Sequence, residues 1–167
     1  MGDEAAGHNY RHGRGTDEAH RRDQALFSQL LERHTALRRV TEPLPNGIRV
    51  QTLSDDPQLA EVLWQHVEGM DARFAGGRAI RSWDPLFSAL FEFRAQIRMD
   101  YRQVPGGVEA VLTAEDPKLV ELIHAHDETL HAFVEKGFEA SKHPSPVPDW
   151  VLAHYGLPTA APEPDSV

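Results

Sequence analysis

Apolar residues recur with a helical period in four segments of the chain. Two of these segments begin with LFSQLLE at residue 26 and LFSALFE at residue 86, and two longer ones span residues 59–74 and 119–133. Spacings of three and four residues place the apolar side chains on one face of a helix. Each of the four predicted helices therefore has one buried face.

Segments with alternating apolar residues lie between the predicted helices. IRVQTL at 48–53 and VEAVLT at 108–113 place every second residue on one face, as in a half-buried strand. PNG at 45–47 and PGG at 105–107 come directly before them, and Asn and Gly can adopt the positive φ angles that tight turns require. The pattern predicts two β-hairpins.

The chain resembles itself when its first half is placed on its second half. Residues 25–77 align with residues 85–137 without a gap, and 16 of the 53 pairs are identical. The longest match joins DDPQLAEVLWQH to EDPKLVELIHAH. We interpret this similarity as an internal duplication, in which each copy contains a helix, a hairpin of two strands and a second helix.

The duplication predicts an α+β fold in which two αββα units form a pseudo-twofold antiparallel sheet, with the helices packed on one face. We expect the two repeats to form one domain. A short turn containing Trp150, Val151 and Tyr155 could dock onto it. The expected boundaries are an irregular N-terminal segment at 1–22, the first repeat at 23–77, a linker at 78–83, the second repeat at 84–142 and a Pro-rich tail at 143–167.

The second helix of each repeat is preceded by acidic residues and a proline. Asp56 and Asp116 each stand directly before a proline, as expected of residues that cap a helix N-terminus. Gly77 and Gly137 are natural helix stops. We interpret the acidic pairs as helix caps rather than as catalytic carboxylates.

Composition excludes several classes of function. The 167 residues include no cysteine, which rules out disulfides, thiolate metal sites and cysteine nucleophiles. The formal charge of −9 and the lack of basic runs argue against a nucleic-acid partner. No apolar run reaches the roughly 18 residues of a membrane span, and no signal peptide is evident. We therefore expect a cytoplasmic protein without a membrane partner.

Two of the ten histidines are related by the duplication. His66 and His126 occupy the same position in the two copies, each on the apolar face of a long predicted helix. His124 and His131 have no histidine counterpart. A pseudo-twofold axis would let the related pair face one another or line matching pockets. The remaining histidines are assigned surface roles, three in the N-terminal segment and three at the isolated positions His34, His143 and His154.

A buried imidazole needs a hydrogen-bond partner, a ligand or a lowered pKa. One alternative is an ordinary core histidine that bonds a carbonyl or a carboxylate such as that of Asp127. The other is a shared ligand site. Met70, one turn after His66, adds a thioether that suits haem iron or copper. His124 and His131 are further candidate metal ligands. An apolar lining favours haem, which needs few axial ligands, over zinc or nickel.

Three functions remain open. The leading hypothesis is a cofactor-binding protein in which His66 and His126, with Met70 as a further candidate, hold haem or a copper-type ion near the pseudo-twofold axis. The second is a cofactor-free interaction or assembly module, which could form a homodimer. The third is a small-molecule enzyme with His126 or His124 as general base. The chain contains no dinucleotide-binding, P-loop, zinc-protease or serine-hydrolase motif to support the third.

Three segments resemble a family of small bacterial proteins that have the same tandem arrangement and no established activity. They are LPNGIRVQTLSDDPQLAEVLWQHVEGMDAR, DPLFSALFEFRAQIRM, and LVELIHAHDETLHAFVEKGFEA with the HPSPVP that follows it. The resemblance covers about residues 24–148. It implies the duplicated fold and supports the choice of His66 and His126, and the family's motifs also include a methionine at the position of Met70, but it implies no function. The family often has histidines where this chain has Arg33 and Phe93, so a site of four histidines is not expected here.

Overall fold

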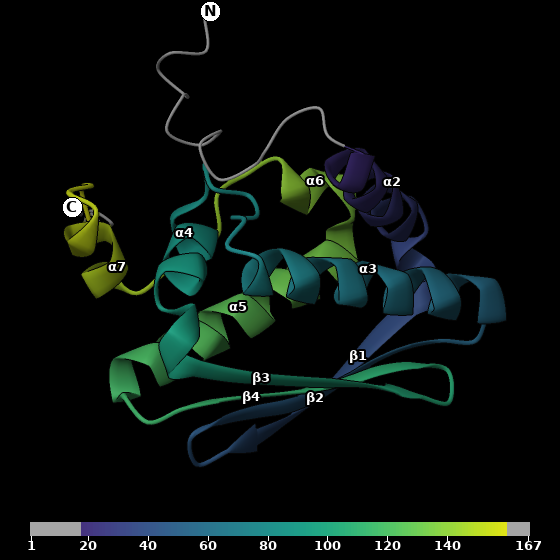
Figure 1. The fold of residues 1–167 in the computed structure, drawn as a ribbon, viewed down its shortest axis with the longest axis horizontal. Coiled ribbons are helices and arrows are strands. Elements are labelled where there is room, and N and C mark those ends of the chain that lie inside the picture. Colours follow the sequence, from purple (N-terminus) through teal and green to yellow (C-terminus); the bar gives the residue numbers. More distant parts are fainter. Residues whose placement is uncertain (1–17, 160–167) are drawn as a thin grey trace, which may run out of the picture.

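The computed structural model describes residues 18–159. Each half contributes a helix, a short 3-10 turn, a β-hairpin and a long helix (Figure 1). The elements are α2 (Glu18–Glu32), η2 (His34–Ala36), β1 (Leu37–Leu44), β2 (Gly47–Ser54), α3 (Pro57–Ala75), α4 (Pro85–Glu92), η3 (Arg94–Gln96), β3 (Ile97–Val104), β4 (Gly107–Ala114), α5 (Pro117–Lys136), α6 (Phe138–Ser141) and α7 (Asp149–His154). The strands and 3-10 turns of the second half therefore occupy the positions that the internal alignment matches to those of the first.

The four strands form one antiparallel sheet in the order β1-β2-β4-β3. In the central pair of strands, Val50 lies opposite Ala110, its counterpart in the second repeat. The register is symmetric about this pair, since Gly47 faces Thr113 and Leu53 faces Gly107. An approximate twofold axis therefore passes between Val50 and Ala110.

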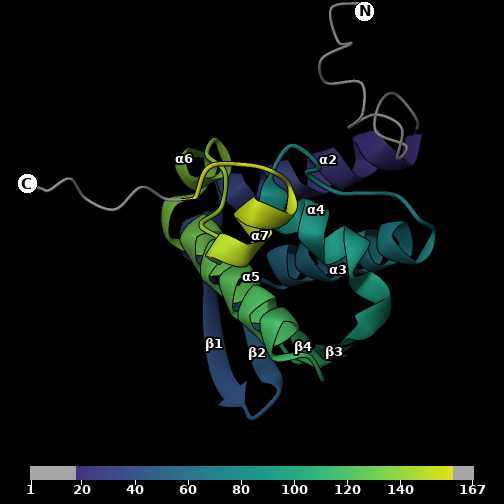
Figure 2. The ribbon, with the colours of Figure 1, turned by 90° about the vertical axis from the view of Figure 1, so that its left-hand side faces the viewer.

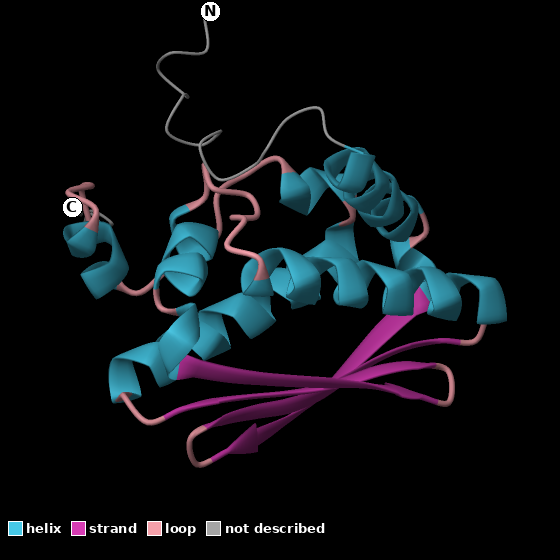
Figure 3. Ribbon diagram, in the orientation of Figure 1, coloured by secondary structure: helices cyan, strands magenta, loops and turns pink. Residues whose placement is uncertain are grey.

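The helices cover one face of the sheet (Figures 1 and 2). The secondary-structure colouring of Figure 3 shows a layer of strands with all helices on one side of it. The expected α+β class, with one face of the sheet covered, is confirmed. Within residues 18–159, no helix is both long and apolar enough to cross a membrane.

The hairpins differ from the prediction. Gly106 has a φ of +84°, but neither Asn46 nor Gly47 has a positive φ. Gly47 and Gly107 are needed for another reason, because the central strands approach closely at both ends of their pairing. A Cβ atom at Gly47 would lie 1.8 Å from the backbone oxygen of Leu112, and one at Gly107 would lie 2.0 Å from that of Thr52.

The helix ends follow the prediction. Asp56 and Asp116 each accept a hydrogen bond from the backbone N–H two residues later, at the starts of α3 and α5. Gly77 and Gly137 have φ angles of +79° and +61° just after these helices. Asp84 caps α4 in the same way and is fully buried. The acidic residues before Pro57 and Pro117 are therefore helix caps.

One boundary prediction needs correction. Residues 18–22 belong to α2 rather than to an irregular segment. The helix is held there by a contact remote in sequence, since buried Asp23 pairs with Arg73 of α3 at 3.6 Å. The Pro-rich tail contains α7, whose Val151 is fully buried against the core, so the predicted docking of this segment is confirmed. Residues 1–17 and 160–167, including His8 and His12, lie outside the described residues.

Candidate ligand-binding site

A cavity of about 700 Å³ lies between the sheet and the helices. Its lining is mainly aliphatic and aromatic, and α2, α3, α4 and α5 and all four strands contribute to it. His66, Met70 and His126 all line this one cavity. The structure therefore brings together the three residues on which the leading sequence hypothesis depends.

His66 lies in α3 against the first helix of the same half. Its ring stacks on that of Phe27, with centroids 5.6 Å apart and planes inclined by 15°. Its Nδ1 atom is fully enclosed and has no hydrogen-bond partner within residues 18–159. Burial lowers the pKa of His66 from 6.5 to about 4. The imidazole is therefore neutral at pH 7.

His126 has the matching environment in the second half. Its ring contacts that of Phe87, the counterpart of Phe27, with centroids 5.7 Å apart in an edge-to-face arrangement. Burial and, to a lesser extent, the positive charge of Arg39 lower the pKa of His126 to about 4, although the carboxylate of Asp127 opposes the shift. No hydrogen bond joins His126 to another described residue. Neither histidine is thus the hydrogen-bonded core residue that the first alternative required.

A series of ring contacts connects the two histidines. Phe27, which stacks on His66, also meets Phe133 edge to face at 5.6 Å. The guanidinium of Arg81 then lies 5.2 Å from the centre of the Phe133 ring and 5.4 Å from that of Phe87. Since Phe87 contacts His126, the two imidazoles are joined by a continuous wall of aromatic rings and one guanidinium.

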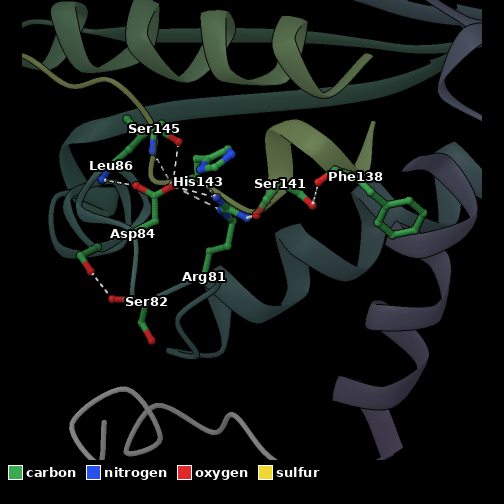
Figure 4. A network of polar contacts seen from close by, with 9 residues as sticks. Arg81, Ser82, Asp84, Leu86, Phe138, Ser141, His143 and Ser145 are labelled. Atoms are coloured by element: carbon green, nitrogen blue, oxygen red, sulfur yellow. Dashed lines mark hydrogen bonds and ion pairs between the residues drawn. The ribbon is translucent and has the colours of Figure 1, made fainter. Parts of the chain in front are cut away.

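Arg81 is held in place by a buried polar network (Figure 4). It donates to the carboxylate of Asp84, at 3.1 Å from Nη2, and to the backbone oxygens of Ser141 and His143. Asp84 also accepts from the hydroxyl of Ser145 at 2.7 Å. This network ties the loop before α4 to the segment after α5. Arg81 has a φ of +52°, the only positive φ of a non-glycine residue within 18–159.

The cavity wall at β1 contains a second buried ion pair. The Arg39 side chain is only 3% exposed, and its Nη1 lies 2.8 Å from Oδ1 of Asp127 in α5. Burial lowers the pKa of Arg39, and Asp127 offsets part of this effect. Arg39 also bonds Nδ1 of His131 at 2.8 Å. Because a guanidinium only donates, this nitrogen of His131 must accept, and the ring proton is on Nε2.

Tyr101 lines the cavity from β3, at the opposite edge of the sheet. Burial raises the pKa of its hydroxyl far above the ordinary value, and the nearby carboxylate of Asp71 raises it further. The Tyr101 hydroxyl is therefore protonated at pH 7. The neutral imidazoles are the better lone-pair donors in this cavity.

Four other histidines show where the surface and ligand assignments made from the sequence hold and where they fail. His124 is exposed on α5, and neither it nor His131 lines the cavity. His20 of α2 does line the cavity, so its expected place in a loose segment is wrong. His34 is not a surface residue, because its Nδ1 donates to the backbone oxygen of Val134 at 2.6 Å. Among residues 18–159, no three or more His, Asp or Glu side chains are grouped as a metal-ion site.

The sequence did not indicate Arg39, Tyr101 and Arg81 as residues of the cavity. Arg39 and Tyr101 lie in strands β1 and β3, whose alternation is masked by polar residues on both faces. Their burial depends on residues far away in the sequence, such as Asp127, 88 positions after Arg39. The only signal in the sequence is the internal alignment, in which Arg39 corresponds to the apolar residue Met99.

Comparison with known proteins adds no relative: no protein-family model, curated protein or solved structure matches the chain. The functional argument therefore depends on the residues of the cavity.

Proposed function

We propose that this protein binds haem in the cavity between the sheet and the helices, where His66 and His126 would be ligands to the iron. The observation that carries the proposal is that two neutral imidazoles at equivalent positions border one apolar cavity. Haem iron takes one or two protein ligands, and neutral histidine is the commonest of them.

The size and lining of the cavity support this choice. Cavities of roughly 300–1,000 Å³ hold small-molecule ligands and cofactors in proteins, and the volume here is about 700 Å³. Side chains such as Phe27, Phe87 and Leu130 line it, and a largely apolar macrocycle would be stabilised by contact with them. When bound, haem would supply the redox or gas-binding chemistry of iron. The residues of the chain keep two imidazoles neutral.

A copper-type ion alone receives less support. Such an ion needs about three or four protein ligands, and the described residues contain no group of three His, Asp or Glu side chains. Met70 could add only one thioether to the two imidazoles. In haem, the macrocycle itself supplies the remaining ligands to the metal.

We infer that the two halves arose by internal duplication, which accounts for the paired imidazoles. The identical residues in the alignment of 25–77 with 85–137, including His66 and His126, support this inference. The symmetric register about Val50 and Ala110 supports it as well. A duplicated unit with one histidine per copy would provide two imidazoles to one cavity.

The test is titration of the purified protein with hemin, followed by absorption spectroscopy. We expect a stoichiometric shift of the Soret band and a six-coordinate, low-spin spectrum. His66→Ala and His126→Ala should each give a five-coordinate, high-spin spectrum or weaker binding. The double variant should lose the shifted band altogether.

His124→Ala is the matched control, because His124 is exposed on the same helix as His126 and does not line the cavity. Its spectrum should equal that of the wild type. Far-UV circular dichroism of each variant establishes that it is folded. A wild type without a hemin-induced band, or a folded double variant with the full wild-type spectrum, would falsify the proposal.

A further inference from the structure

The strands place a guanidinium in the cavity lining on only one side of the pseudo-twofold axis. Arg39 and Thr52 are paired across β1 and β2, and both line the cavity. Their counterparts in the second repeat, Met99 and Leu112, are paired across β3 and β4 and line it as well. Since β1 and β3 form opposite edges of the sheet, the guanidinium of Arg39 lies at one end of the cavity, and the other end holds Met99 and the hydroxyl of Tyr101.

The guanidinium of Arg39 still has hydrogen-bond donors to offer. Nη1 is used by three acceptors, two on Asp127 and one on His131, and Nε donates to Thr52 Oγ1 at 3.3 Å. Nη2 bonds no residue within 18–159 and is not enclosed by protein atoms. Because Arg39 lines the cavity, these two N–H groups are the ones that a ligand there would meet.

The other two arginines in the lining are already engaged, since Arg73 pairs with Asp23 and donates to the backbone oxygen of Ala79. Every nitrogen of the Arg81 guanidinium donates to Asp84 or to the backbone oxygens of Ser141 and His143. An anionic ligand would need a cationic donor in the cavity, because a chain with a formal charge of −9 repels anions on average. Arg39 is thus the group best placed to receive an anion in the cavity.

We propose that Nη2 of Arg39 binds a carboxylate of the cavity ligand, so that the protein selects an apolar carboxylic acid over the corresponding neutral ester. The inference rests on the proposed haem site, since haem carries two carboxylates on an apolar macrocycle. The carboxylate lies at the end formed by Arg39 and Thr52, and the apolar body extends toward Met99 and Leu112. A charge-assisted hydrogen bond in a water-poor cavity is about twice as strong as a neutral one.

The test compares hemin with hemin dimethyl ester, which has the same macrocycle and iron but no carboxylate. We expect the wild type to bind hemin at least about tenfold more tightly. Arg39→Met, which installs the residue of the second repeat, should reduce this preference to less than threefold while the shifted Soret band remains. Because Arg39→Met leaves Asp127 unpaired, the Arg39→Met/Asp127→Asn double variant is measured beside it, and circular dichroism verifies folding.

Arg49→Met is the matched control, since Arg49 lies between the cavity-lining Ile48 and Val50 and therefore points to the opposite face of the sheet. It should keep the wild-type preference. A Soret shift of equal affinity with both compounds in the wild type overturns the Arg39 site but leaves the haem site standing.

A second probe separates the two proposals if hemin gives no Soret shift, which would refute the haem site. cis-Parinaric acid, a fluorescent apolar carboxylic acid, is then compared with its methyl ester. A preference of about tenfold for the acid that is lost in the Arg39 variants supports the carboxylate site. Equal binding of acid and ester, or binding of neither, overturns it.

Discussion

The imidazole of His66 lies nearly parallel to the ring of Phe27, with centroids 5.6 Å apart. This contact covers one face of the imidazole, and the Nδ1 atom of the ring is enclosed by the protein. Desolvation then lowers the pKa of His66 to about 4, and the same cause acts on His126 in the other half. Both histidines therefore resist protonation in the folded state.

We predict that acid destabilises the protein through these two imidazoles. The unfolded chain takes up protons at its histidines as the pH falls below 6.5, whereas the folded protein does so only near pH 4. Stability is therefore full above pH 6.5 and is lost as the pH falls toward 4. At pH 5 the loss should be at most about 2 kcal/mol per imidazole.

The measurement is urea unfolding of the apoprotein at pH 7 and pH 5. The His66→Leu/His126→Leu variant should lose much less stability between these pH values than the wild type. His124→Leu, at an exposed position on α5, should retain the wild-type dependence. Equal pH dependence in the wild type and the double variant would show that the two histidines are not the cause.

A second prediction concerns the three aspartates that cap helices before a proline. Asp84 is 0% exposed and holds Arg81 and Ser145 as well as the start of α4, whereas Asp116 is exposed and caps α5 alone. Asp84→Ala leaves the Arg81 charge unpaired inside the protein and should cost about 3–5 kcal/mol. Asp116→Ala should cost about 1 kcal/mol.

Urea denaturation at pH 7 measures both losses. Asp84→Asn keeps a capping oxygen but removes the charge, so its stability should lie between those of the wild type and Asp84→Ala. Similar losses for the Asp84→Ala and Asp116→Ala variants would mean that the network around Arg81 contributes little.

Much of the fold could be predicted because residues 25–77 and 85–137 carry the same local signals. The helical period, the caps at Asp56 and Asp116 and the hairpins are all properties of short segments, and each occurs twice. The alignment of the two halves of the sequence was enough to pair His66 with His126. The placement of both in one cavity is the three-dimensional consequence of the antiparallel pairing of Val50 with Ala110.

What could not be predicted depends on contacts between the repeats or on features that only one repeat has. Arg39 reads as one of several arginines in a polar strand, and only the approach of Asp127 from α5 makes it a buried residue. The network of Arg81, Asp84 and Ser145 likewise joins segments that are far apart in the sequence. Periodicity contains no information about such pairs, because it describes only which face of an element is apolar.

The glycines after the two long helices provide a third prediction. Gly77 and Gly137 both have positive φ, so replacement by alanine strains the backbone at either site by roughly 1 kcal/mol. Their surroundings differ. A Cβ atom at Gly137 would lie 2.5 Å from the ring of His34, whereas at Gly77 the nearest atom belongs to Arg94, 4.0 Å away.

Gly137→Ala should therefore destabilise the protein by clearly more than Gly77→Ala, as measured by thermal unfolding at pH 7. The His34 ring cannot easily move aside, because its Nδ1 is bonded to the backbone oxygen of Val134. Adding His34→Ala to Gly137→Ala should recover part of the additional loss. Equal destabilisation by the two glycine substitutions would indicate that only backbone strain matters.

A final prediction concerns two threonine hydroxyls with opposite surroundings. Thr129 of α5 is 5% exposed, and its hydroxyl has no hydrogen-bond partner within residues 18–159. The hydroxyl of Thr41 on β1 donates instead to Oδ1 of Asp127 at 3.1 Å.

Thr129→Val replaces an unsatisfied polar group by a methyl group of similar size and should stabilise the protein by about 1 kcal/mol. Thr41→Val removes one donor to a buried carboxylate and should destabilise the protein by a similar amount. Urea unfolding of both variants measures the two signs, and a loss of stability in Thr129→Val would mean that its hydroxyl is satisfied in solution, for instance by a buried water.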